Sequence, residues 1–153
     1  MKLLISFLLL ITTLYSKTIE VAISSALTGP AKELGVNMTL GIELYFKKNN
    51  LNNKNHNFEL IVFDDGYEPK RASLNMRQIV KTKNILAVLG NVGTPTANVT
   101  VPIANENEIL LFGAFTGAGV LRKNPPDKYI INYRASYIQE TESMINGLLK
   151  NGI

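Results

Sequence analysis

Short, continuously apolar runs alternate along the chain with longer stretches that mix apolar and polar residues. The runs are typical of β-strands, and those that are apolar throughout are typical of strands covered on both faces, as in a parallel sheet. The predicted strands are 18–24, 59–65, 85–90, 109–114 and 129–135. We expect residues 60–63, 85–90 and 109–114 to be covered in this way.

The stretches between the runs predict helices. Residues 36–44 alternate as a strand would, but Val36, Leu40 and Leu44 also recur at helical spacing. We favour a helix from Pro30 to about residue 48, because proline suits a first helical turn and the two lysines at its end suit a last one. Further helices are predicted from Pro69 to about 80, from 95 to 107 and over 140–149.

Two details of the first helix and its exit carry further expectations. Gly41 in mid-helix costs about 1 kcal/mol relative to alanine and therefore indicates a close approach to a neighbouring element. The Asn-rich segment 50–57, which contains the only histidine, His56, is predicted to be a surface loop.

Alternation of strands with helices is typical of βαβ units. The predicted fold class is therefore α/β, with a doubly wound, mostly parallel sheet. Such sheets bind ligands beyond the carboxyl ends of their strands. The loops that we expect to matter are 25–30, 64–68, 91–96 and 115–119.

The first sixteen residues have the pattern of a secretory signal peptide. Lys2 supplies a positive start, an apolar run follows, and Ser16 offers a small residue at the predicted cleavage point. The run is shorter than the roughly 20 residues of a membrane span, although an uncleaved signal could still tether the protein. Residues 17–153 are then predicted to be one exported domain, and the absence of cysteine excludes a lipid anchor.

Composition and charge exclude several functions. The 153 residues carry a net charge of +4, which is weak grounds for nucleic-acid binding. With no cysteine and one histidine, the chain lacks a Ser/His or Cys/His arrangement and a zinc ligand set. We therefore expect a binding protein without catalytic residues, metal or cofactor, whose partner is a small molecule.

Asp64 and Asp65 end the second predicted strand. Adjacent acids at this position could hold a magnesium ion beside a phospho-acceptor. No aspartate ends the 85–90 strand to accept a phosphoryl group, so we favour the interpretation that these carboxylates accept backbone amides of loops or of a helix N-terminus.

Two turns offer candidate binding groups. At Gly93-Thr94-Pro95 a helix N-terminus can hold a carboxylate through free amides, or Thr94 can simply be an N-cap followed by proline. At Phe115-Thr116-Gly117 the glycine allows close approach of a ligand, Thr116 offers a hydroxyl and Phe115 an apolar wall, unless the phenylalanine packs inward. Scattered basic residues are expected to be solvated or paired locally, and these are Arg122, Lys123 and Arg134.

Four segments in order carry a family resemblance, and they are 26–35 (ALTGPAKELG), 60–72 (LIVFDDGYEPKRA), 87–97 (AVLGNVGTPTA) and 110–140 (LLFGAFTGAGVLR through NYRASYIQE). Together they resemble the first lobe of type I periplasmic substrate-binding proteins, in the branched-chain-amino-acid branch of ABC-transporter receptors. The resemblance implies that two lobes close over an amino acid. It implies that Gly93 and Thr94 hold the carboxylate and that Phe115, Thr116 and Gly117 serve the ammonium group, with Thr28 at the edge.

Two departures from the family pattern accompany the resemblance. The threonine stands at position 116, whereas the ammonium-binding threonine of the amino-acid receptors aligns with Gly117. Residues 17–153 correspond to the first lobe and stop where the family enters the second. We expect this lobe by itself to bind amino acids weakly or not at all, because a half-cleft leaves the ligand wet.

The resemblance implies a periplasmic receptor of an ABC importer for amino acids or similar small carboxylates, working with a membrane permease. An alternative is the extracytoplasmic sensing domain of a signal-transduction protein, to which the same lobe can be attached. An exported hydrolase that uses Asp64 and Asp65 comes third.

Overall fold

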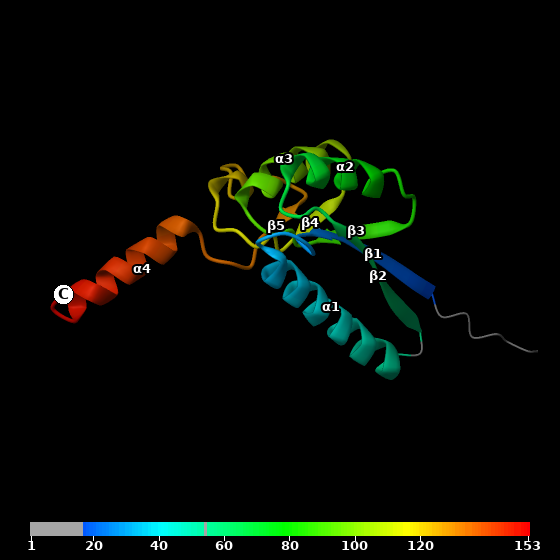
Figure 1. Ribbon diagram of the computed structural model, residues 1–153, viewed down its shortest axis with the longest axis horizontal. Helices are drawn as coiled ribbons and strands as arrows, with labels where there is room; N and C mark the ends of the chain where they lie inside the picture. The colour runs from blue at the N-terminus through cyan, green and yellow to red at the C-terminus, as the bar shows by residue number, and fades with distance from the viewer. Residues whose placement is uncertain (1–16, 54) are drawn as a thin grey trace, which may run out of the picture.

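Five strands form one parallel sheet in the computed structural model, which describes residues 17–53 and 55–153 (Figure 1). Their order is β2-β1-β3-β4-β5, and all neighbouring pairs are parallel. The α/β class with a parallel sheet is therefore confirmed, while the predicted signal peptide lies outside the described residues. The strands are β1 Lys17–Ser25, β2 His56–Asp64, β3 Ile85–Leu89, β4 Leu110–Phe112 and β5 Ile130–Ile131.

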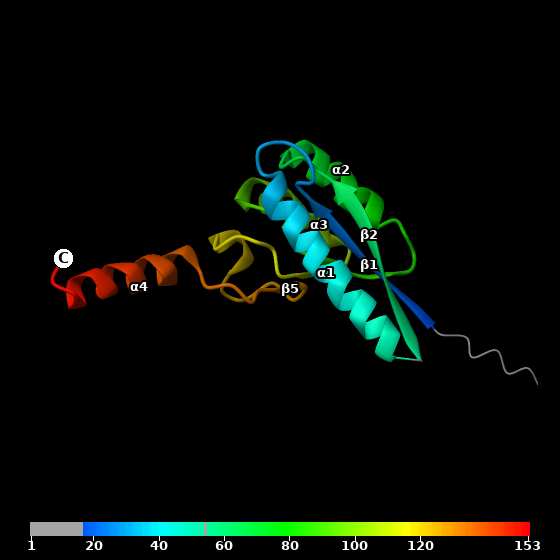
Figure 2. The ribbon, with the colours of Figure 1, turned by 60° about the horizontal axis from the view of Figure 1, so that its bottom comes forward.

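Helices cover both faces of the sheet, but unequally. Figure 1 shows α2 and α3 side by side on one face and α1 on the other, while α4 extends away from the sheet, as Figure 2 also shows. No helix of the described chain is long and apolar enough to cross a membrane. The helices are α1 Lys32–Asn52, α2 Pro69–Ile79, α3 Thr94–Glu106 and α4 Tyr137–Lys150, with a short 3-10 turn at Gly119–Leu121.

The core lies between the sheet and the α2–α3 layer. Because side chains alternate across a strand, one row in register across β3, β4 and β5 packs into this core, and its members are Val88, Leu111 and Ile130. Contacts of α1 with the sheet fall on β1 and β2.

The other face of β4 and β5 is correspondingly open. Phe112 and Ile131 are 40% and 45% exposed there, so the expectation that residues 109–114 are covered on both faces is wrong. Tyr133 stacks on Phe112 at a centroid distance of 6.2 Å and is itself 66% exposed. We call Phe112, Ile131 and Tyr133 the open face.

Two expectations around α1 and β2 are wrong. The helix continues to Asn52 and the strand begins at His56, so the predicted loop 50–57 shrinks to three residues. Strand β2 is not covered on both faces, because it lies at the edge of the sheet and residues 60–63 are only partly buried.

The glycine that makes a close approach in α1 is also not the predicted one. No atom lies within 4 Å of a Cβ added at Gly41, whereas a Cβ added at Gly35 would lie 2.0 Å from the carbonyl oxygen of Ala26. Helix α1 therefore packs tightly against the β1 loop through its first turn rather than through its middle.

The last predicted elements shift for local reasons. The expected strand 129–135 is reduced to β5, because the side chain of Asn132 donates to the carbonyl of Leu121 at 2.6 Å and draws the chain off the sheet. Helix α4 begins three residues earlier than the predicted 140, because Ser136 and Gln139 form a capping box at its start.

Candidate functional site

A cleft of about 600 Å³ opens at the carboxyl ends of the strands, which is the edge that this fold class uses for ligands. Its lining comes from the loops that follow all five strands and from the first turns of α1 and α4. The lining residues are Pro30, Ala31, Leu34, Gly66, Tyr67, Glu68, Val92, Gly93, Phe115, Arg134 and Tyr137.

Asp64 ties the β1 and β2 loops together at the mouth of the cleft. Its Oδ1 accepts the amides of Leu27 at 2.9 Å, Thr28 at 3.2 Å and Gly66 at 2.9 Å. Its Oδ2 accepts the Thr28 hydroxyl at 2.7 Å and the Arg71 guanidinium at 2.8 Å. Burial acts to raise the pKa of Asp64, but these hydrogen bonds together hold it well below its ordinary value.

Asp65 is fully buried beside it. It accepts the Ser24 hydroxyl and the Tyr67 amide, each at 2.9 Å. Burial raises the pKa of Asp65, and the neighbouring charge of Asp64 adds to that effect. The interpretation that these aspartates accept loop amides is therefore confirmed. Among the described residues no group of three His, Cys, Asp or Glu side chains gathers that could hold a metal ion.

A chain of hydroxyls lies behind the cleft. The Thr94 and Thr116 hydroxyl oxygens are 2.7 Å apart, and the Thr116 oxygen is 3.0 Å from the Tyr137 hydroxyl. Thr116 also accepts the Ala118 amide at 3.2 Å and is fully buried. The hydrogen bonds from Thr116 and then Thr94 lower the pKa of Tyr137. This chain couples the start of α3 to the start of α4.

The start of α3 differs from the simpler sequence interpretation. Gly93, with φ +89°, is the N-cap, and Thr94 is the first residue of the helix. The Thr94 side chain makes no capping bond and reaches across to Thr116 instead. The expectation that Thr94 is the N-cap is therefore wrong.

The predicted site residues fall into two groups. Gly93 and Phe115 line the cleft, whereas Thr94 and Thr116 form the hydroxyl chain behind it. Gly117 accepts the Tyr137 amide through its carbonyl at 2.9 Å.

Thr28 lies at the β1 loop with its hydroxyl bound to Asp64, and the lining of the cleft from that loop is formed by Pro30 and Ala31.

Three prominent lining residues were not predicted, namely Tyr67, Arg134 and Tyr137. The Arg134 guanidinium lies over the Phe115 ring at 4.8 Å and pairs with Glu140 at 2.9 Å. The other scattered basic residues are also paired locally, as expected, since Lys123 meets Asp127 at 3.0 Å and Arg122 donates to four backbone carbonyls. Tyr67 lies in loop 64–68, one of the loops expected to border a ligand, and this position was the signal in the sequence that could have identified it.

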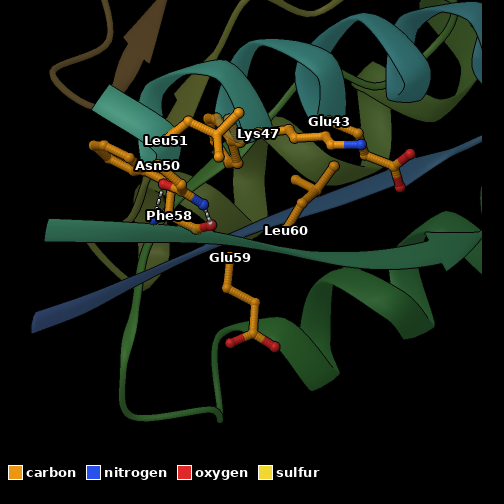
Figure 3. A pocket seen from close by; sticks show the side chains of 8 residues that line it. Glu43, Lys47, Asn50, Leu51, Phe58, Glu59 and Leu60 are labelled. Atoms are coloured by element: carbon orange, nitrogen blue, oxygen red, sulfur yellow. Dashed lines mark hydrogen bonds between the residues drawn. The ribbon is translucent and has the colours of Figure 1, made fainter. Parts of the chain in front are cut away.

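A second hollow lies between α1 and the amino-terminal half of β2 (Figure 3). Asn50, the amide side chain in its lining, donates to the Phe58 carbonyl at 2.9 Å and accepts the Phe58 amide at 2.8 Å. Glu59 points away to the other side of the strand (Figure 3). The amide group of Asn50 is therefore already bound to the strand, and besides Glu59 the charged residues in the lining of this hollow are Glu43 and Lys47 on α1.

The chain that forms this cleft is similar to a known protein family. A family model described as periplasmic binding protein matches residues 18–153. No curated protein sequence matches the chain.

Solved structures give the same family likeness. A possible leucine/isoleucine/valine-binding protein from Rhodopirellula baltica is 44% identical over 94% of this chain and 38% of its own, with a TM-score of 0.85. A substrate-binding periplasmic protein from Ralstonia solanacearum is 29% identical over 88% of this chain and 38% of its own, with a TM-score of 0.80.

A leucine-binding protein from Thermotoga maritima shares the fold at 20% identity, over 87% of this chain and 37% of its own, with a TM-score of 0.76. The chain thus spans less than two fifths of the length of each of these three solved structures.

Proposed function

Because the chain belongs to the periplasmic binding protein family, a family of binding proteins rather than enzymes, we propose that it is the first lobe of an exported receptor that delivers a small carboxylate to an ABC importer. Amino acids are the ligands that the cleft suits best. In this proposal residues 1–16 direct export and residues 17–153 form the lobe.

The observation that carries the proposal is that the N-terminus of α3 borders the cleft through its N-cap, Gly93. The first amides of a helix have no partner within it, and among those of α3 the amide of Thr94, a partly buried residue, is available to a carboxylate without help from a cation. Gly93 lines the cleft directly before this residue. Glu68 lines the same cleft, and its carboxylate is the acceptor that we propose for an ammonium group. An acceptor and a helix N-terminus in one cleft suit a zwitterion.

The remaining predicted residues take supporting roles in this proposal. Phe115 supplies an apolar wall, Thr116 orients the Thr94 hydroxyl, and the Gly117 carbonyl holds the start of α4. Thr28 supports the edge of the cleft through Asp64. The relative from Rhodopirellula baltica makes leucine, isoleucine and valine the first ligands to test.

The mechanism that we propose is closure of a second lobe over this cleft. The ligand bridges the lobes and stabilises the closed state, which a membrane permease then recognises. One lobe alone leaves much of the ligand in water, so its affinity is low.

A chimera tests this proposal. Residues 17–153 are titrated calorimetrically with leucine, isoleucine, valine and other amino acids, alone and joined to the second lobe of the Rhodopirellula baltica relative. We expect millimolar or weaker binding by the lobe alone and micromolar binding by the chimera. A folded chimera that binds none of these ligands would contradict the proposed function, and micromolar binding by the lobe alone would contradict the need for a second lobe.

A further inference from the structure

The loop that carries Tyr67 into the cleft has an unusual backbone. Gly66 and Tyr67 are consecutive left-handed residues, with φ +59° and +67°. A tyrosine at this φ is uncommon and persists only where its surroundings fix it. Here three hydrogen bonds of 2.9 Å fix it, because Asp64 accepts the Gly66 amide, and Asp65 accepts the Tyr67 amide through its side chain and the Glu68 amide through its carbonyl.

The consequence of this turn is contact between Tyr67 and Gly93. A Cβ added at Gly93 would lie 2.1 Å from the Tyr67 ring and 2.5 Å from its hydroxyl oxygen. The phenol therefore lies directly on the peptide that leads into α3. Tyr67 remains 36% exposed and lines the cleft.

The Tyr67 hydroxyl differs from the other hydroxyls near this point. Those of Thr94, Thr116 and Tyr137 bind one another. Within residues 17–53 and 55–153 no hydrogen bond engages the Tyr67 hydroxyl. A phenol O–H is a good donor, and this one lies beside the first turn of α3.

We propose that Tyr67 contacts the ligand and selects for an acid group, its hydroxyl donating to the carboxylate that the first turn of α3 binds. This inference rests on the proposed function, since it assumes a small carboxylate in the cleft. It assigns a purpose to the paired aspartates, which hold the turn that delivers the phenol. A hydroxyl-to-carboxylate hydrogen bond is among the stronger kinds in proteins.

Acetate, the simplest carboxylate probe, tests the assignment without knowledge of the natural ligand. The full chain is titrated with sodium acetate while the backbone amide signals of Thr94 and Thr96 are followed by NMR. We expect saturable shifts in the wild type and roughly fivefold to tenfold weaker binding in Tyr67→Phe, the loss of about one hydrogen bond. Tyr45→Phe is the matched control, because Tyr45 lies on α1, is 64% exposed and does not line the cleft.

Two results would overturn the assignment. One is equal acetate affinity in the wild type and Tyr67→Phe. The other is a wild type in which neither amide responds to acetate. Because Tyr67→Phe keeps the ring, the fold is expected to survive, and the dispersion of the remaining amide signals checks this.

Different experimental outcomes would contradict the proposed function and the proposed role of Tyr67. Amino-acid binding by the chimera that is unchanged by Tyr67→Phe would leave the proposed function intact and refute the role of Tyr67. Acetate binding that depends on Tyr67, in a chimera that binds no amino acid, would support the role of Tyr67 and refute amino acids as the ligand class.

Discussion

Asp64 is the residue on which the mouth of the cleft depends. Its two oxygens accept three backbone amides, a hydroxyl and a guanidinium from the β1 loop, the β2 loop and α2. An asparagine side chain has the same shape but only one acceptor oxygen, because its other terminal atom is a donor nitrogen. The charged form is therefore the one that organises the loops.

We expect Asp64→Asn to lower the free energy of unfolding at pH 7 by about 2 kcal/mol, because hydrogen bonds to charged groups are lost. Urea denaturation followed by circular dichroism measures this. Glu59→Gln is the control, since that side chain on β2 lies outside the cleft. A loss below about 0.5 kcal/mol would show that the loops do not need the charge.

The pH dependence has a definite sign. The pKa of Asp64 is lower in the folded chain, so its contribution is present above the unfolded value near 4 and is lost as the pH falls below it. Asp65 acts oppositely, because its raised pKa favours the folded state when it is protonated. We expect wild-type stability to fall more steeply below pH 4 than that of Asp64→Asn, and parallel curves would contradict the assignment.

At the scale of the element, α1 contains two glycines that differ in the space available for a side chain. Gly35 meets the backbone of Ala26, whereas Gly41 faces open space. The same substitution at the two positions therefore separates packing from helix propensity.

We expect Gly35→Ala to destabilise the chain by about 3 kcal/mol or more, because its Cβ would overlap a carbonyl that cannot move freely. Gly41→Ala is expected to stabilise it by about 1 kcal/mol through helix propensity alone. Thermal and urea unfolding of both variants provide the measurement. Equal effects would mean that α1 does not dock through Gly35.

The elements with a strong apolar pattern were predictable from the sequence. The core of β3 and the helices after Pro69 and after Gly93 lie close to where the pattern places them. The edge position of β2 was not predictable, because an apolar run does not reveal which strand lies beside it. The end of the sheet was also missed, since Asn132 binds Leu121 across a loop.

The candidate site was predictable as a set of loops, but its side chains were less so. Gly93 and Phe115 could be predicted as site residues because each lies in a turn that follows a strand. Tyr67 did not, because its approach to Gly93 depends on two left-handed residues that only the aspartate hydrogen bonds stabilise. Long-range contacts of this kind leave no periodic signal in the sequence.

For the molecule as a whole, the uneven cover of the sheet is the main feature. Helices α2 and α3 bury one face, while the open face leaves Phe112, Ile131 and Tyr133 in contact with water. Contiguous exposed apolar surface binds hydrophobic dyes and promotes association.

We expect residues 17–153 to bind the dye ANS and to self-associate with rising concentration in sedimentation experiments. Ile131→Thr should reduce both effects. Leu51→Thr should not, although Leu51 is 80% exposed on α1, because it lies outside the open face. Equal reduction by the two variants would show that overall hydrophobicity rather than this patch drives association.

The attachment of α4 has a mechanical consequence. None of its 14 residues is buried, and its first residue, Tyr137, is held by Gly117 and Thr116. At 1.5 Å per residue the helix is about 21 Å long, so a pivot of about 10° at Tyr137 would move its far end by about 4 Å. The position of the far end of α4 therefore depends on the few contacts at Tyr137, a residue that lines the cleft.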